Sequence, residues 1–148
     1  MNKLIIKTAV ATLVSVLAVG LISLIVLTCF FPKTLADFNY KLGNEKLSIY
    51  YSELNYKKTG DIEDLEELIA KIHEAEHYEK CVDYSNKMLE NEEYFEGKED
   101  YKAYIVSELA VALYKTGYSK ADCMQIVSNY LQDEDKIQLI QTVLDKLQ

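Results

Sequence analysis

The sequence contains no arginine and no tryptophan, and only one proline, two histidines and three cysteines. Acidic residues outnumber lysines by 24 to 16. A nucleic-acid ligand is therefore not expected, because phosphate binding needs a basic patch, and attraction to anionic lipid is not expected for the same reason. The acidity indicates a solvated surface or, as an alternative, an acidic groove for a basic partner.

The cysteines are odd in number and include no closely spaced pair, so neither a disulfide framework nor a zinc knuckle is indicated. Cys81 and Cys123 lie in helical patterns, where a free cysteine usually packs as a small apolar residue. We expect both to be buried thiols.

One uncharged and almost wholly apolar run extends from Thr8 to Phe31. Its roughly 24 residues would form about 36 Å of helix, enough to cross a hydrocarbon core of about 30 Å. The run predicts a transmembrane helix over 8–31, after a basic N-terminal tail at 1–7. Two alternatives stay open: a cleaved signal peptide, for which the run is long, and a lipoprotein signal at Cys29, which the preceding residues fit poorly.

The orientation in the membrane depends on the flanking charges. Lys3 and Lys7 precede the run, whereas Lys33, Lys41 and Lys46 follow it, so the positive charges are nearly balanced. The short basic N-terminus is typical of a signal anchor, and it predicts a single-pass cell-membrane protein with its domain outside the cytoplasm. The unpaired cysteines favour the opposite side.

Apolar positions after this run recur at an offset of 34 residues. A weaker third copy follows 40 residues after the second, with the extra residues in the polar stretch 92–100. Within each copy the spacing of three and four is that of amphipathic helices, although an ordinary helical bundle with chance spacing is an alternative. Six of the seven matched pairs are apolar or aromatic on both sides, and Tyr51 over Ser85 is the exception. The matched positions are Phe31, Leu35, Phe38, Leu47, Tyr50, Tyr51 and Leu54 with Leu65, Ile69, Ile72, Cys81, Tyr84, Ser85 and Met88.

The pattern predicts an all-α domain over 32–148, without β-strands. Asp61 and Ser119 are expected as helix N-caps, and Gly60 and Gly117 as helix ends. The predicted helices cover 33–42, 45–58, 62–75, 78–91, 101–115, 119–131 and 134–147, the last of them as a capping helix.

A helix–turn–helix unit of 34 residues resembles the tetratricopeptide repeat. The family's tryptophan and its repeat-ending proline are absent here, and Leu47 and Cys81 replace a small alanine where the two helices cross. The resemblance covers about residues 33–131 and implies an α-solenoid of about three helical hairpins. It is carried by Tyr40-Lys41-Leu42-Gly43-Asn44, Tyr78-Glu79-Lys80-Cys81 and Tyr114-Lys115-Thr116-Gly117-Tyr118.

In that family the first helix of each hairpin lines a concave face that binds extended peptides or partner helices. The resemblance therefore implies a membrane-anchored, non-enzymatic docking module for another protein or peptide, without a cofactor. A single-pass structural subunit of a membrane complex is an alternative. The residues implied for the groove are Asn39, Tyr40, Glu63, Glu66, Ala70, His73, Glu74, Val106, Ala110, Leu113 and Tyr114.

Both histidines fall in the segment from His73 to His77, which matches the H-E-x-x-H motif of zinc peptidases. On one helix the two imidazoles would face the same way and could share a zinc ion, with Glu74 activating water. A catalytic zinc site needs a third protein ligand, however, and the repeat places His77 at a turn. We expect no metal site, and a membrane-anchored zinc metallopeptidase using these three residues is the alternative.

Overall fold

A computed structural model describes the backbone of residues 2–147 and the side chains of residues 5–147. This part of the chain contains eight α-helices, one short 3-10 helix and no β-strand, which confirms the predicted all-α class. It divides into two compact units, one ending at Lys58 and the other beginning at Thr59.

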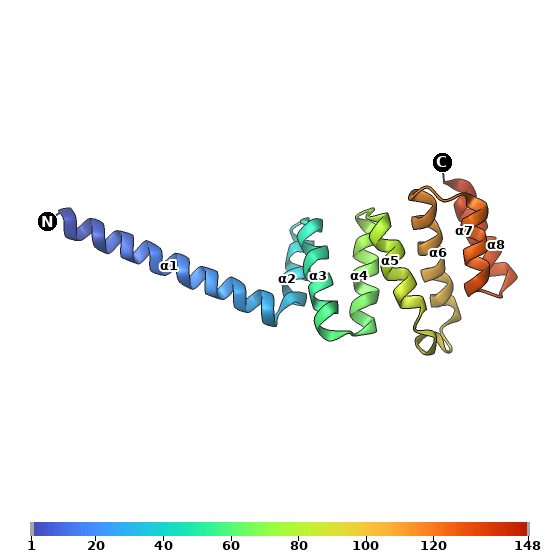
Figure 1. The fold of residues 1–148 in the computed structure, drawn as a ribbon, viewed down its shortest axis with the longest axis horizontal. Coiled ribbons are helices and arrows are strands. Elements are labelled where there is room, and N and C mark those ends of the chain that lie inside the picture. The colour runs from blue at the N-terminus through green and yellow to red at the C-terminus, as the bar shows by residue number, and fades with distance from the viewer. Residues whose placement is uncertain (1, 148) are drawn as a thin grey trace. The chain divides into compact units, whose positions relative to one another are not determined.

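The first unit begins with α1 (Asn2–Phe30), shown in blue in Figure 1. Its segment Ile5–Phe30 is long and apolar enough to cross a membrane, and none of its most apolar stretch is buried within the chain. A signal sequence near an N-terminus meets the same criteria of length and composition. The hydroxyl groups of Thr12 and Ser15 each donate to the backbone carbonyl four residues earlier at 2.9 Å, so the helix satisfies these polar groups itself.

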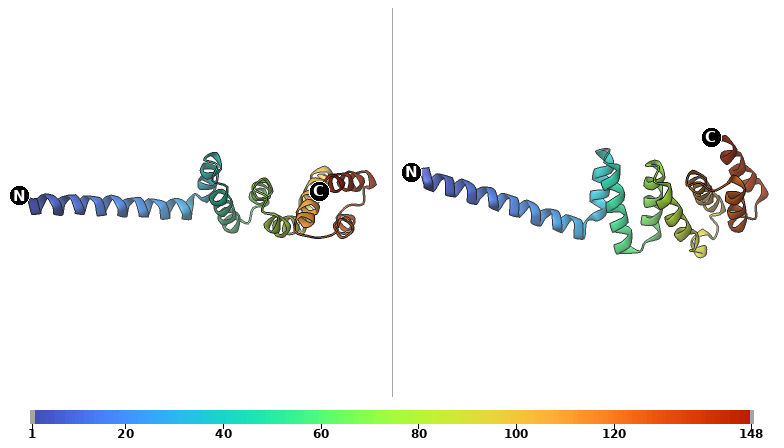
Figure 2. Two further views of the ribbon diagram at one scale, coloured as in Figure 1. Left: turned by 90° about the horizontal axis from the view of Figure 1, so that it is seen from above. Right: turned by 45° about the horizontal axis from the view of Figure 1, so that its top comes forward.

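A helical hairpin of α2 (Pro32–Lys41) and α3 (Glu45–Thr59) follows α1. Both helices run across the direction of α1 (Figures 1 and 2). In the last turn of α3, Lys58 Nζ donates to the Cys29 carbonyl at 3.0 Å and to the Phe30 carbonyl at 3.3 Å. Because the last carbonyls of a helix have no partner within it and carry partial negative charge, this contact fastens the end of the hairpin to the end of α1.

The second unit is built around α6 (Glu99–Lys115), which packs against three other helices of the unit. These three are α5 (Tyr78–Leu89), α7 (Lys120–Tyr130) and α8 (Glu134–Lys146). α4 (Ile62–Glu74) packs against α5, and a 3-10 helix, η1 (Glu92–Phe95), precedes α6. The predicted helix ranges therefore agree with the observed helices to within two residues at each end.

The core of the second unit contains most of the apolar repeat positions together with further apolar residues of the same helices. Its most buried side chains are at most 2% exposed. They include Leu65, Leu68, Ile69 and Ile72 of α4, Cys81 and Met88 of α5, Ile105, Leu109 and Ala112 of α6, Cys123 and Val127 of α7, and Leu144 of α8.

Of the positions predicted for the third copy (Ile105, Leu109, Ala112, Tyr118 and Ala121), the first three are buried. Tyr118 and Ala121 are exposed because they lie at the turn into α7 and at its first residues.

The predicted N-caps are confirmed. The Asp61 carboxylate accepts a hydrogen bond from the Glu63 backbone N–H at 3.2 Å, and Ser119 Oγ accepts one from the Asp122 backbone N–H at 3.1 Å. Each side chain satisfies a donor that the first turn of a helix leaves without a partner. Gly60, with φ of 67°, turns the chain between α3 and the cap of α4.

The helices from α2 to α7 form three consecutive hairpins, α2–α3, α4–α5 and α6–α7, and the first helix of each ends in the same turn. In each hairpin the second residue after the first helix adopts the left-handed backbone conformation. These residues are Gly43 (φ 71°), Glu76 (φ 56°) and Gly117 (φ 104°). The N–H of each donates to the carbonyl three residues back, and the next N–H donates to the carbonyl five residues back. These are the paired hydrogen bonds of a left-handed C-cap. Glu76 is the exception in residue type, because this conformation costs a residue with a Cβ about 1–2 kcal/mol.

The α2–α3 hairpin exposes the apolar face whose counterpart in the α4–α5 hairpin is core. Phe38 is 59% exposed and Leu47 is 42% exposed, whereas the aligned residues Ile72 and Cys81 are fully buried. The buried side chains of the first hairpin are instead mostly small or polar. They are Pro32, Ala36, Asn39, Ser48, Ile49, Ser52, Asn55 and Tyr56.

We expect the substitution Glu76→Gly to stabilise the second unit by about 1 kcal/mol, because glycine adopts the left-handed conformation without a steric cost. In thermal melts of the full chain in detergent, followed by circular dichroism, the midpoint should rise by about 4–8 °C. Gly117→Ala, at the same position of the next hairpin, is the matched control and should lower the midpoint. A lower midpoint for Glu76→Gly would contradict the expected strain.

Candidate functional site

Polar side chains connect α4 to α6 on one face of the second unit. Glu66 lies close to Tyr101, and seven residues later on both helices His73 Nδ1 contacts Glu108 Oε2. The matching order of these two contacts means that α4 and α6 run in the same direction. The His73 and Glu108 side chains are 30% and 12% exposed, so this connection is largely shielded from solvent.

A ladder of three tyrosines, Tyr94, Tyr101 and Tyr104, extends this face from η1 along α6. The ring centroids of Tyr94 and Tyr101 are 6.3 Å apart, and those of Tyr101 and Tyr104 are 6.1 Å apart. The buried ring of Phe95 lies against the first two, and Lys98 Nζ lies 3.7 Å from the centre of the Tyr94 ring. Aromatic pairs at such separations contribute about 0.5–1.5 kcal/mol beyond their burial.

The carboxylate of Glu66 anchors the tyrosine ladder to α4. The Tyr94 hydroxyl donates to Glu66 Oε2 at 3.1 Å. Burial, this hydrogen bond and the negative charges of Glu66, Glu63 and Asp61 raise the pKa of Tyr94. The Tyr101 hydroxyl is buried and has no acceptor in hydrogen-bond geometry among the described residues, and burial together with the charge of Glu66 raises its pKa. Both phenols therefore stay protonated well beyond neutral pH.

The burial of His73 disfavours the protonated form of its imidazole. Burial lowers the pKa of His73, and the negative charge of Glu76 acts in the opposite direction. A neutral imidazole with its proton on Nδ1 presents this N–H to the Glu108 carboxylate, and it forms an ion pair only when protonated.

An apolar groove of about 380 Å³ lies between α6 and α8. Two of its large side chains are well exposed, Tyr104 at 49% and Leu139 at 66%. A hydrogen-bonded ion pair between Lys136 and Asp100, 2.8 Å apart, lies at its border. The remaining lining consists of Ala103 and Ser107 of α6 with Ile140 and Val143 of α8.

Tyr104 belongs both to the tyrosine ladder and to this groove. The face is therefore continuous from the carboxylates of α4, across the ladder, to the apolar groove. We refer to Glu63, Glu66, the tyrosine ladder and the α6–α8 groove together as the docking face.

The α4 residues that were predicted to line a groove lie on or beside this face. Glu63, Ala70 and Glu74 are exposed, and Glu66 and His73 are partly buried against η1 and α6.

The predicted groove residues of α6 are mostly not available to a ligand. Val106, Ala110 and Leu113 are 1%, 1% and 4% exposed, so they belong to the core rather than to an open apolar end of a groove. The physical reason is that α6 is covered by α5, α7 and α8, and that the predicted capping helix packs against α6 as well as α7. Tyr114 is half-buried, with Lys120 Nζ 5.4 Å from the centre of its ring.

The two predicted groove residues of the first unit differ in exposure. Asn39 is 8% exposed and its Nδ2 donates to the Leu35 carbonyl at 2.8 Å, whereas Tyr40 is 46% exposed. A groove that continues through all three hairpins stays a prediction.

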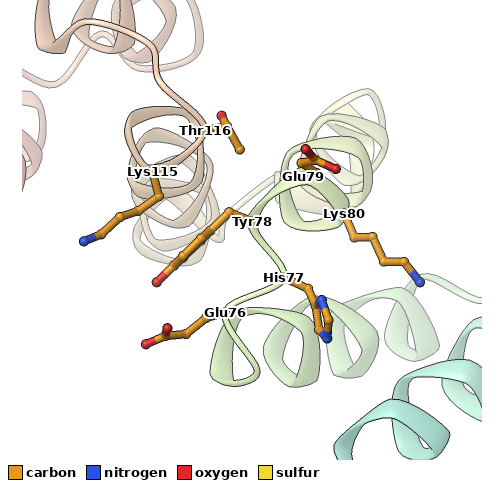
Figure 3. A pocket seen from close by; sticks show the side chains of 7 residues that line it. All are labelled: Glu76, His77, Tyr78, Glu79, Lys80, Lys115 and Thr116. Atoms are coloured by element: carbon orange, nitrogen blue, oxygen red, sulfur yellow. The ribbon is translucent and has the colours of Figure 1, made fainter.

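The H-E-x-x-H segment is divided between two helices. α4 ends at Glu74, and His77 is the N-cap residue of α5, so the two imidazoles do not share one face of a continuous helix. Figure 3 shows His77 on the opposite side of the turn from Tyr78 and Lys115. Within the part of the chain that the structure describes, no three His, Cys, Asp or Glu side chains are grouped closely enough to hold a metal ion. The single helix that the zinc-peptidase alternative assumes for His73 and His77 is not formed, because α4 ends before His77.

A pocket of about 510 Å³ surrounds this turn (Figure 3). Its lining mixes the carboxylates of Glu76 and Glu79 with the ammonium groups of Lys80 and Lys115. This balance of charge favours no single class of ligand.

The two cysteines of the second unit are buried, as predicted. Cys81 and Cys123 are both 0% exposed, and burial raises the pKa of each thiol. Cys81 Sγ lies 3.8 Å from Ser85 Oγ within the core. Both thiols therefore act as packing groups.

The tyrosine ladder and Glu108 were missed in the sequence. Two signals could have indicated them. Tyr94 and Phe95 form an aromatic pair inside an otherwise acidic stretch, and Tyr101, Tyr104 and Glu108 recur at three and four residues, which places them on one face of a helix.

Comparisons of this chain with protein-family models, with curated proteins and with solved structures found no match.

Removing the hydroxyl of Tyr94 and removing that of Tyr101 should affect the stability differently. Tyr94→Phe loses a hydrogen bond to a carboxylate and should lower the free energy of unfolding by about 1 kcal/mol. Tyr101→Phe removes a buried hydroxyl that lies near Glu66 but has no acceptor in hydrogen-bond geometry among the described residues, and it should leave the stability unchanged or raise it. Urea denaturation of the two variants in detergent measures both values, and a larger loss for Tyr101→Phe would contradict the described hydrogen bonding.

The raised pKa of Tyr101 predicts a loss of stability in alkali. Tyrosines of the unfolded chain have a pKa of about 10, whereas burial raises the pKa of Tyr101 in the folded chain above that value. The contribution of protonated Tyr101 to the stability of the fold is therefore complete below about pH 10, and it is lost as the pH rises further. Urea midpoints should fall more steeply with pH for the wild type than for Tyr101→Phe. The two proteins have the same lysines, so the titration of lysine contributes equally to both. Equal slopes would contradict the shift.

Proposed function

We propose that this chain is a membrane-anchored, non-enzymatic docking protein. In this proposal α1 is an uncleaved span, the following domain lies outside the cytoplasm, and the second unit binds another protein or peptide. The observation that carries the proposal is the docking face, where exposed Tyr104 and Leu139 flank an apolar groove beside a row of carboxylates. Exposed aromatic and aliphatic side chains around a groove are typical of protein-recognition surfaces.

The arrangement of the helices supports a binding role of the kind that helical-hairpin repeats perform. Three hairpins share the same closing turn, and the first helices of two successive hairpins, α4 and α6, run in the same direction and are connected by side chains. Stacked hairpins of this type present one continuous face formed by their first helices. A domain that resembles tetratricopeptide repeats remains part of the proposal.

The charge of the second unit indicates which partner would fit. From residue 59 onward the chain has nine lysines and 21 acidic residues, a net charge of −12. Glu63 and Glu66 place part of this charge next to the tyrosine ladder. A partner with an apolar side chain for the α6–α8 groove and a basic side chain for these carboxylates would be complementary to the face.

Site-specific photo-crosslinking in the native membrane tests the proposed face. A photoreactive amino acid at position 104 should form a discrete crosslinked product with a partner protein, because Tyr104 lies within the proposed face. The same amino acid at Tyr118 is the matched control, since Tyr104 is 49% exposed and Tyr118 is 50% exposed. Leu139→Glu should abolish the product by placing a charge in the groove without disturbing the core.

Three results would contradict the proposal. These are an equal product from position 118, no product from either position, and a product from position 104 that persists unchanged in Leu139→Glu. In the last case a dependence on substitutions in α1 would indicate that the span assembles the complex.

A further inference from the structure

The α2–α3 hairpin presents an apolar surface to solvent directly after α1. Phe31, Phe38 and Leu42 recur along α2 at helical spacing and are 55%, 59% and 66% exposed, and Leu47 and Tyr50 of α3 are 42% and 52% exposed. We call these five residues the hairpin stripe. Five large exposed apolar side chains in one short hairpin are more than ordinary scatter, and they favour an interaction surface.

The charge of the hairpin is opposite in sign to that of the second unit. Residues 32–58 contain five lysines and three acidic residues, a net charge of +2. Lys41 and Lys46 are exposed beside Leu42 and Leu47 of the stripe. The acidity that disfavours anionic lipid as a ligand therefore belongs to the chain from residue 59 onward, and not to the segment that follows α1.

The position of the hairpin relative to α1 decides what the stripe can meet. A single residue, Phe31, separates the end of α1 from the start of α2. Lys58 at the end of α3 donates to the carbonyls of Cys29 and Phe30 at the end of α1. Both α2 and α3 run across the direction of α1 (Figures 1 and 2). With α1 spanning a bilayer, the hairpin extends along the membrane plane. Phe31 lies at the end of the span, and Phe38 follows within about 11 Å along α2.

We propose that the α2–α3 hairpin lies on the bilayer surface, with the hairpin stripe in the interfacial layer and Lys41 and Lys46 near the lipid phosphates. Aromatic rings and lysines are the side chains that favour this layer, and anionic lipid attracts basic residues placed next to a span. The inference rests on α1 spanning the membrane, as proposed above, and it is independent of the docking face.

Single-tryptophan reporters test this arrangement directly, because the chain has no tryptophan of its own. Four variants of the full chain are reconstituted into phosphatidylcholine vesicles with and without phosphatidylglycerol and with lipids brominated on the acyl chains, which quench tryptophan at close range. Phe38→Trp and Tyr50→Trp report on the stripe, Leu17→Trp reports on α1, and Tyr118→Trp, at a site 50% exposed, is the matched control in the second unit.

We expect the two stripe reporters to lose most of their emission to the brominated lipid and to shift to shorter wavelength, whereas the reporter at position 118 keeps its emission. Adding Lys41→Glu and Lys46→Glu should reduce the loss in vesicles with anionic lipid. If the reporter at position 17 is quenched but the stripe reporters keep their emission as the one at 118 does, the inference is overturned, whereas α1 still spans the membrane. An unquenched reporter at position 17 would overturn the span itself.

A second copy of the chain is the competing occupant of the stripe. It predicts a shift to shorter wavelength that grows with the protein-to-lipid ratio and that occurs without quenching by the brominated lipid. That result would also overturn the inference.

Discussion

Packing against α6 holds the second unit together. The neighbouring helices have 11 to 13 residues, a length at which helices in water are marginal without tertiary contacts. α6 provides those contacts to α5, α7 and α8, and its last three turns are largely buried as a result. Only its first turns, with Tyr101 and Tyr104, are left to form a surface. The docking face therefore lies where the central helix emerges from its neighbours.

The helices and their ends could be predicted because they follow local rules. Apolar spacing located each helix, and Asp61 and Ser119 were recognisable as caps from their own chemistry. The left-handed turn at Glu76 could not be predicted in the same way, since glycine is the usual sign of this conformation. In the H-E-x-x-H segment, that turn separates His77 from α4. The sequence motif is therefore present, but its two histidines do not lie on one helix.

The burial of each face depended on neighbours that local spacing does not reveal. Val106 and Leu113 have the spacing of a helix face, but the number of helices around α6 decides that this face is core. Conversely, Phe38 aligns with the buried Ile72 and is exposed. The tyrosine ladder required η1 to fold back so that Tyr94 reaches Glu66, and this contact joins residues 28 positions apart. Helix positions were therefore more predictable than the surface that they create.

The burial of Cys81 and Cys123 has a consequence for the redox environments that the second unit tolerates. A thiol reacts with oxidants as its thiolate, and burial both raises the pKa of these two groups and blocks access to them. A reducing glutathione pool and disulfide-forming enzymes would therefore both leave the folded unit chemically unchanged. Its two thiols can stay free in a reducing or an oxidising compartment for as long as the unit stays folded.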